Sequence, residues 1–239
     1  MSAKTIVMTD IHGCIREFEK LLKIIRPNPE EDTFVFLGDA VDRGPDEWAV
    51  VEKLIAMKWE FGEERFFWLM GNHEMKLVEK LRKKKRMPFY IQHDILYYLP
   101  VFRSLPFKAE NDECIFVHAG YSDNPKKNTR KLLLEDRSVL RRKRLYSGKL
   151  YIAGHSPIMH PLYVDPYGNI IKAESGMDLP EHGAIFMDTG CINGGRLTAM
   201  VIKDHKIQFY SVPSEQKPAL PAAEDRETYR KSDSKVERS

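Results

Sequence analysis

The sequence predicts an α/β fold, and three of its features support this prediction. Short apolar runs rich in isoleucine, valine and phenylalanine recur along the chain and are typical of strands. They lead into motifs that contain glycine, and amphipathic helical patterns follow the first two of these motifs. The length of 239 residues suits one domain of ordinary size plus a tail, so we expect a single folded domain over residues 1–212.

Strands and helices are predicted to alternate in the first part of the chain. The apolar runs predict strands at Thr5–Met8, Thr33–Leu37, Arg65–Met70, Cys114–Val117 and Leu150–Ala153. Apolar residues at helical spacing predict one helix from Ile15 to Ile25, which Pro27 ends, and another from Trp48 to Ile55. Loops at the carboxyl ends of such strands are held by the sheet and stay open to solvent, so we expect the functional side chains there.

The later part of the chain is richer in strands. Residues 162–171 predict a hairpin with its turn at Asp165–Asn169, and residues 197–201 with 207–212 predict a second one. Beyond Val212 the chain is rich in proline, serine, glutamate and lysine and has few apolar residues. Because such a segment cannot offset the entropy cost of ordering, residues 213–239 are expected to form a disordered tail.

The composition excludes several classes of protein. The 38 basic and 35 acidic residues give a net charge of +3, which is too small to indicate nucleic-acid binding. Three distant cysteines, Cys14, Cys114 and Cys191, form no Cys-x-x-Cys pair, so we expect no disulfide framework and favour the reducing cytoplasm. No apolar run approaches the roughly twenty residues of a membrane helix, so no membrane partner is expected.

Polar motifs flanked by glycine follow the predicted strands. They are Asp10-Ile11-His12, Gly38-Asp39-Ala40-Val41-Asp42-Arg43-Gly44, Gly71-Asn72-His73-Glu74, His118-Ala119-Gly120 and Gly154-His155. Any one of these aspartates or histidines would usually be a helix cap or a buried core residue. The whole set is better explained by two closely spaced metal ions. In an extended chain Asp10 and His12 would point the same way and hold one ion, while Ile11 enters the core.

The second and third motifs together resemble the phosphoprotein phosphatase family of metallophosphoesterases, in particular its compact bacterial members. The resemblance extends from Thr5 to about Val201. Thr9 departs from the family pattern, because the family usually has glycine there; since this residue is not a ligand, the metal site is expected to remain intact. The resemblance implies a four-layer α/β/β/α sandwich of two mixed β-sheets flanked by helices.

The resemblance also implies how the two divalent metal ions are held. Asp39 would bridge both ions, and its negative charge would offset their repulsion. Asn72, His118 and His155 would hold the second ion. Such a mixed shell of oxygen and imidazole ligands favours Mn²⁺, with Fe or Zn²⁺ as alternatives, over a Mg²⁺ or Ca²⁺ site made of oxygen atoms alone.

The metal pair predicts hydrolysis of phosphoesters. Water that bridges two such ions ionises readily, so the predicted nucleophile is a metal-bridging hydroxide that attacks phosphorus directly, without a covalent intermediate. His73 is the predicted proton donor to the leaving oxygen. The family pairs this histidine with the aspartate that matches Asp42, which would hold the imidazolium in place.

Two arginines are expected to bind the phosphate oxygens. Arg43 belongs to the second motif, and Arg137 matches an arginine of the family in the segment Leu133–Arg137. The alternatives to Arg137 are Arg141, Arg142 and Arg144. Glu74 is expected to support the ligands or to start a helix rather than to act in the chemistry.

Three further segments bear on specificity. The basic runs Arg82–Arg86 and Arg141–Arg144 are typical of solvated helix faces, but either would favour acidic phosphoproteins or polyphosphorylated nucleotides if it bordered the cleft. The aromatic segment Phe89–Tyr98 is consistent with a groove lining or with helical core packing. The segment Asp188–Cys191 resembles an ending of the bacterial members, and we interpret it as structural, with Cys191 as a small buried residue.

These observations favour a cytoplasmic, manganese-dependent serine/threonine protein phosphatase that acts on phosphoprotein substrates. The alternative is a symmetrical dinucleoside tetraphosphate hydrolase, which would act on phosphorylated nucleotides with the same site. A silent protein that only binds RNA or an acidic partner is disfavoured, because a pure binder would gain nothing from six metal ligands together with His73 and Arg43.

Overall fold

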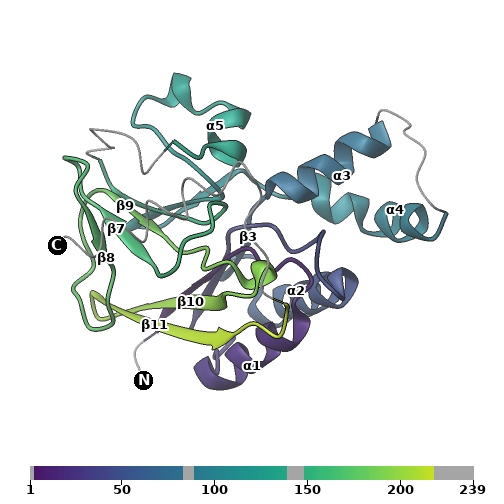
Figure 1. Ribbon diagram of the computed structural model, residues 1–239, viewed down its shortest axis with the longest axis horizontal. Coiled ribbons are helices and arrows are strands. Elements are labelled where there is room, and N and C mark those ends of the chain that lie inside the picture. The colour runs from purple at the N-terminus through teal and green to yellow at the C-terminus, as the bar shows by residue number, and fades with distance from the viewer. Residues whose placement is uncertain (1–2, 83–88, 139–147, 218–239) are drawn as a thin grey trace.

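Two mixed β-sheets flanked by helices form the structure, which confirms the predicted fold class (Figure 1). The computed structural model describes residues 3–82, 89–138 and 148–217. The first sheet has the order β11-β10-β1-β2-β3, formed by Lys206–Pro213, Arg196–Lys203, Thr5–Met8, Thr33–Phe36 and Phe66–Trp68. The second has the order β4-β5-β6-β9-β7-β8, formed by Lys108–Glu110, Cys114–Val117, Leu150–Ala153, Ala184–Phe186, Leu162–Val164 and Ile170–Lys172.

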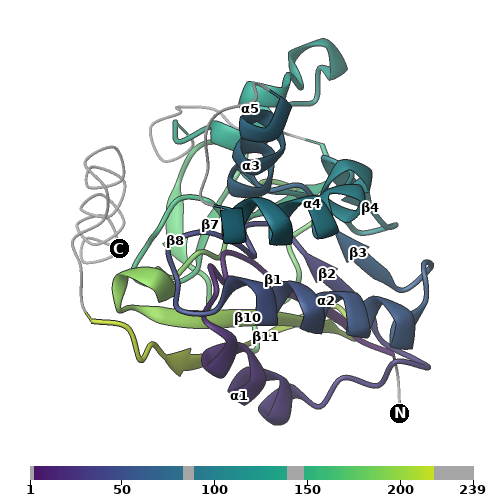
Figure 2. The same ribbon diagram turned by 90° about the vertical axis from the view of Figure 1, so that its right-hand side faces the viewer.

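The helices cover the outer faces of the two sheets. The α-helices are α1 (Ile15–Ile25), α2 (Glu47–Phe61), α3 (Asn72–Arg82), α4 (Phe89–Ser104) and α5 (Arg130–Glu135), and the 3-10 turns are η1 (Pro125–Lys127) and η3 (Cys191–Asn193). Figure 2 shows α1 and α2 in front of the first sheet. On the second sheet, Leu133 of α5 packs in a buried cluster with Ile115 and Val117 of β5.

The main core lies between the two sheets, and alternation along the strands builds it. Val7 of β1 and Val35 of β2 pack against Phe116 and Ile152 of the second sheet. Ile6, the neighbour of Val7, points the other way and packs under the helices. The first three strands, β1, β2 and β3, are parallel, so their carboxyl ends and the loops that follow them lie at one edge.

Both predicted hairpins are present. β7 and β8 pair in antiparallel fashion, and the Asp165 carboxylate closes their turn by accepting hydrogen bonds from the backbone N–H groups of Tyr167 and Asn169, at 2.9 Å each. β10 and β11 pair over their whole length. Past Val212, the N–H of Glu215 donates a 2.7 Å hydrogen bond to Glu17 of α1. The rest of the predicted tail, from residue 218, lies outside the described residues.

The structure describes only part of the basic and aromatic segments that could set substrate specificity. Residues 83–86 and 141–144, which carry most of the two basic runs, lie outside the described residues. The aromatic segment lies on α4, where Tyr98 is buried and its ring stacks on Trp48 of α2, with 5.3 Å between the ring centroids. Across the described segments, no helix combines the length and apolar character needed to cross a membrane.

Candidate metal centre

The five polar motifs converge in the structure, as their places after strands predict. Asp10 and His12 follow β1, Asp39 follows β2, and Asn72 begins α3 shortly after β3 ends at Trp68. From the second sheet, His118 follows β5 and His155 follows β6. All six side chains are almost fully buried, with relative exposures of 5 % or less. The sheet edges therefore bring together every residue that was predicted to bind metal.

Glycines let these loops pack backbone against side chain. A Cβ atom on Gly71 would collide with the backbone nitrogen and the carboxylate of Asp39. A Cβ atom on Gly154 would collide with the side chains of Thr9 and Asp10. The glycines of these motifs are thus required by the close approach of loops from different strands.

The predicted extended geometry of the first motif is wrong. Asp10 and His12 have φ values of +50° and +47°, so both adopt the left-handed conformation and do not sit two residues apart on a strand. Ile11 is nevertheless fully buried, as predicted. Asp39 and His155 also have positive φ, at +62° and +69°. Left-handed non-glycine residues are costly, and their concentration here is typical of a functional site that the surrounding structure holds in place.

Two histidines are oriented by backbone carbonyl groups. Nδ1 of His12 lies 2.9 Å from the carbonyl oxygen of Val41, and Nδ1 of His118 lies 3.0 Å from that of Leu37. Each Nδ1 therefore carries a proton and donates it, and each Nε2 faces the acidic centre. Nε2 of His12 lies 3.6 Å and Nε2 of His118 lies 3.5 Å from the carboxylate oxygen Oδ2 of Asp39. A carbonyl partner of this kind is the usual way to aim a histidine at a metal ion.

The amide of Asn72 lies between two of the candidate histidine ligands. One of its two polar atoms is 2.9 Å from Nε2 of His118 and 3.0 Å from Nδ1 of His155. When that atom is the nitrogen, it donates to both histidines and to the Asp39 carboxylate, and the oxygen accepts from Nζ of Lys76 at 3.0 Å. With a cation bound at the centre, the amide oxygen would face the cation instead.

The electrostatics of the centre also favour positive charge among these side chains. Burial raises the pKa of Asp10 to about 6 and lowers the pKa of His12 to about 4. Burial also acts on Asp39 and His118, but their attraction outweighs it: the pKa of Asp39 falls well below its ordinary value and that of His118 rises to about 9. Positive charge is therefore favoured beside Asp39, and metal ions would supply it.

Two groups of potential ligands share one carboxylate. One group consists of His12, Asp39 and His73, and the other consists of Asp39, His118 and His155. Within each group the ligand atoms lie within 4.8 Å of one another. Asp10 joins the first group, because its Oδ1 lies 3.8 Å from Nε2 of His12. The donor set thus fits two ions with Asp39 between them.

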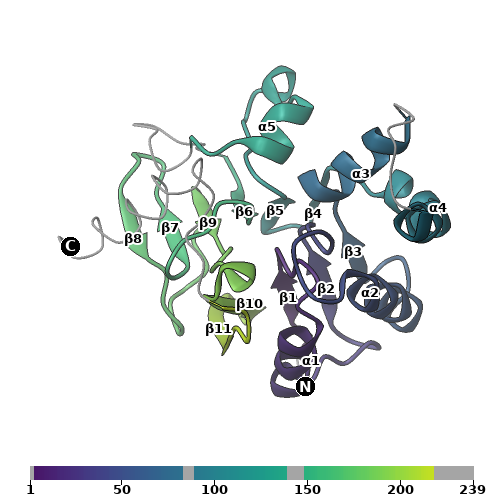
Figure 3. The ribbon, with the colours of Figure 1, turned by 45° about the vertical axis from the view of Figure 1, so that its right-hand side comes forward.

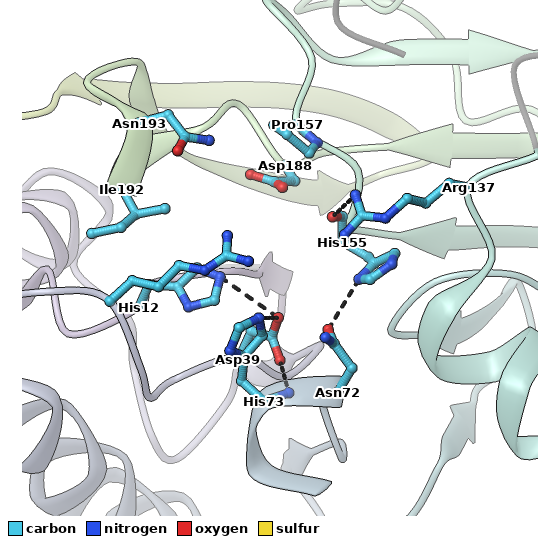
Figure 4. A pocket seen from close by; sticks show the side chains of 11 residues that line it. His12, Asp39, Asn72, His73, Arg137, His155, Pro157, Asp188, Ile192 and Asn193 are labelled. Atoms are coloured by element: carbon cyan, nitrogen blue, oxygen red, sulfur yellow. Dashed lines mark hydrogen bonds and ion pairs between the residues drawn. The ribbon is translucent and has the colours of Figure 1, made fainter. Parts of the chain in front are cut away.

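The predicted catalytic side chains surround the same pocket. Nδ1 of His73 lies 2.7 Å from the carboxylate of Asp42, and this hydrogen bond lowers the pKa of Asp42 to about 2. Arg43 and Arg137 both line the pocket. Figure 4 shows Arg137 beside His155, and its Nη1 donates to the carbonyl oxygen of His155 at 3.4 Å. The alternative arginines at 141, 142 and 144 lie outside the described residues.

Two further side chains, those of Thr9 and Glu74, support the candidate ligands. Thr9 donates its hydroxyl to the carboxylate of Asp10, so the departure from glycine adds a hydrogen bond to a candidate ligand. Glu74, fully buried, accepts from the N–H groups of Asp39, Ala40 and Gly71 at 3.0, 2.6 and 3.1 Å. This carboxylate ties the second motif to the third and matches the supporting role expected of it.

Asp188 was interpreted as structural, but its side chain lines the pocket opposite Asp39 (Figure 4). It follows β9, and burial raises its pKa well above the ordinary value. Its place after a buried strand and before glycine was the signal that could have found it. Cys191, three residues later, is buried, and its hydrogen bond with Cys14 and its burial raise its pKa, as suits an inert thiol.

A sandwich of two mixed sheets, with aspartate, asparagine and histidine converging from strand ends, defines the metallophosphoesterase class of enzymes. The sequence profile of the calcineurin-like phosphoesterases matches residues 3–195, and the chain belongs to this family. Enzymes of this class are hydrolases that depend on metal ions.

Known proteins of two kinds are similar to the chain. It is 25 % identical to the asymmetrical bis(5'-nucleosyl)-tetraphosphatase PrpE of Bacillus thuringiensis, over 87 % of this chain and 93 % of the relative. It is 26 % identical to PrpE of a Geobacillus species, again over 87 % of this chain and 93 % of the relative. The structure of a serine/threonine phosphatase from Saccharomyces cerevisiae has the same fold, with a TM-score of 0.62 and 15 % identity over 92 % of this chain and 82 % of that one.

Proposed function

We propose that this protein is a cytoplasmic serine/threonine protein phosphatase that uses two divalent metal ions, Mn²⁺ in the first place and Fe or Zn²⁺ as alternatives. The observation that carries the proposal is the buried ligand set around Asp39 with the His73 and Asp42 pair at its edge. A metal pair alone serves many hydrolyses, but a histidine held by a carboxylate adds a proton donor for a poor leaving group. Serine and threonine oxygens are such leaving groups.

The chain would hold the ions with six residues. Asp10 and His12 belong to one ion, Asn72, His118 and His155 to the other, and Asp39 to both. When bound, the ions supply the positive charge that ionises a water molecule and polarises the phosphoryl group. The buried, backbone-oriented side chains keep this charge in place without reorganisation during the reaction.

The remaining site residues act on the phosphate and on the leaving group. Arg43 and Arg137 bind the nonbridging oxygens, and their guanidinium groups balance the charge that develops there. As water attacks phosphorus and the ester bond breaks, His73 donates the proton on Nε2 to the departing alcohol oxygen. Asp42 accepts a hydrogen bond from Nδ1, which fixes the orientation of the imidazole.

Hydrolysis of dinucleoside tetraphosphates is the second candidate, and the similarity to the PrpE enzymes favours it. Those relatives are named asymmetrical tetraphosphatases. Asymmetrical cleavage of the dinucleotide is therefore a candidate reaction beside the symmetrical cleavage considered above. The same ligand set would serve both reactions. A nucleotide leaving group is already acidic, however, and needs less help from His73 than an alcohol does.

A single comparison tests the proposal. A phosphothreonine peptide, an aryl phosphate and diadenosine tetraphosphate are assayed with Mn²⁺ and with chelator. The proposal expects hydrolysis of the peptide and the aryl phosphate that chelator abolishes. A value of kcat/KM for the dinucleotide far above that for the peptide would replace the first candidate by the second, and full activity with chelator would overturn both.

A further inference from the structure

A second hollow, of about 270 Å³, lies between α3, the end of α4 and the start of α5. We call it the arginine-rimmed hollow. Apolar side chains form most of its lining: Met70, Met75, Val78, Leu105 and Phe107. Four charged side chains complete it: Arg82, Arg103, Arg130 and Glu79. The size and composition suit one large apolar group with anionic groups beside it.

The charges around the hollow favour an anionic ligand. Nη1 of Arg130 pairs with Glu79 at 3.2 Å, and its guanidinium lies 5.9 Å from the centre of the Phe107 ring. Arg82 and Arg103 form no ion pair with any described residue, and both are exposed. The sequence continues from Arg82 into Lys83-Lys84-Lys85-Arg86. Three arginines thus face a single glutamate, and the excess positive charge is available to a partner.

Helix α3 connects the hollow to the metal centre. Helix α3 begins with Asn72 and His73 in the metal pocket and continues past Val78 to Arg82 on the hollow. At the rise of an α-helix, Val78 lies about 8 Å and Arg82 about 14 Å along the axis from His73. Helix α5 begins with Arg130 on the hollow and leads to Arg137 in the pocket (Figure 3 shows α3 and α5 on neighbouring sides of the molecule).

We propose that the arginine-rimmed hollow binds an acidic segment of a phosphoprotein substrate that carries one large apolar side chain. The apolar side chain packs on Val78, Leu105 and Phe107, and flanking carboxylates pair with Arg82 and Arg103. From the distances along α3, the phosphorylated residue lies about two to four extended residues away from this apolar anchor. The proposal rests on the proposed function as a protein phosphatase.

The lining favours a peptide over a nucleoside. A base and a ribose need hydrogen-bond partners that read their edges, and the apolar lining offers thioether, aliphatic and phenyl groups. A leucine or phenylalanine side chain needs no such partners. The rim guanidinium groups match carboxylates, which they bind in a bidentate way.

Binding is tested without catalysis. The probe is a fluorescein-labelled, unphosphorylated peptide with a leucine flanked by glutamates, and its affinity is measured by fluorescence anisotropy. The double variant Arg82→Glu and Arg103→Glu should raise its Kd about tenfold or more, because attraction becomes repulsion. Lys23→Glu, an exposed charge reversal on α1, should leave the Kd unchanged. Equal Kd values for wild type and the double variant would overturn the proposal.

Kinetics separate the hollow from the proposed function. For a phosphothreonine peptide that carries the acidic segment, the double variant should raise KM about tenfold and leave kcat unchanged; the aryl phosphate should show no change. Arginine-dependent peptide binding without hydrolysis of any phosphopeptide would support the hollow and reject the proposed function. If wild type and the double variant hydrolyse phosphopeptides with the same KM, the proposed role of the hollow is rejected and the proposed function stands. A change confined to diadenosine tetraphosphate would assign the hollow to nucleotides instead.

Discussion

The metal centre and the arginine-rimmed hollow share α3 but hold their side chains in different ways. In the metal centre, buried histidines such as His12 and His118 are fixed by backbone carbonyl groups, and the Asp39 carboxylate accepts from the N–H of His73. In the hollow, Arg82 and Arg103 are exposed, and most of the other lining side chains are apolar. The difference matches the two tasks, because ion binding requires atoms at set positions, whereas charge attraction tolerates movement.

The comparison predicts that loss of a metal ligand is severe and independent of substrate, while changes in the hollow are moderate and specific to one substrate class. Five substitutions in and around the metal centre sharpen this contrast, and each has a readout that the hollow should not share.

The largest effect is expected for Asp39→Ala. This carboxylate belongs to both ligand groups, so its loss removes charge stabilisation worth several kcal/mol and should lower kcat/KM by about four orders of magnitude for every substrate. Elemental analysis should find less metal bound. Asp178→Ala, which removes an exposed carboxylate paired with Lys206, is the matched control and should retain full activity. A substrate-dependent loss in Asp39→Ala would erase the contrast with the hollow.

His73→Asn should show the next largest effect, and it should depend on the leaving group. Loss of the proton donor should slow the hydrolysis of a phosphothreonine peptide about a hundred- to a thousandfold. Hydrolysis of an aryl phosphate, whose leaving group is acidic, should slow far less. The metal content should stay near that of wild type. Asp42→Asn should give the same pattern with a smaller amplitude, because Asp42 acts through His73 at 2.7 Å. A uniform loss on both substrates would argue against the role as an acid.

Glu74→Gln should weaken metal binding without altering the leaving-group dependence. The carboxylate accepts from three N–H groups in two motifs, and an amide can accept with only one of its two polar atoms. Outer partners of metal ligands are worth about ten- to a hundredfold in affinity, so the Mn²⁺ concentration for half activity should rise by that factor. If saturating Mn²⁺ fails to restore kcat, Glu74 has a part in the chemistry itself.

The sequence indicated which residues converge at the candidate metal centre, because its motifs record local requirements. Gly71 and Gly154 are needed for close approach, and aspartate and asparagine are residue types that offer oxygen ligands. The extended geometry predicted for Asp10 and His12 is wrong, because both adopt a left-handed backbone that an extended pattern cannot signal.

Features made by distant segments could not be predicted. The pairing of Ile6 with Val201 joins strands about two hundred residues apart, and neither run carries information on its partner. Strand β9 is three residues long, too short for a periodic pattern. The segment Asp188–Cys191 after it was interpreted as structural because it resembles an ending of the bacterial members. The hollow draws its lining from three stretches of the chain, residues 70–82, 103–107 and Arg130, and none of these stretches forms a recognisable binding motif.

The smallest effect is expected for Thr9→Val, which tests how finely the metal centre is ordered. Valine keeps the shape of threonine but removes the hydroxyl that donates to Asp10. The Asp10 carboxylate keeps its 2.9 Å hydrogen bond from the N–H of His155, so the fold and one orientation constraint persist. One hydrogen bond to a charged group is worth about 1.5 kcal/mol, so Mn²⁺ affinity should fall about tenfold at unchanged saturating kcat. Isothermal titration with Mn²⁺ measures this, and an unchanged affinity would show that Asp10 is positioned by His155 alone.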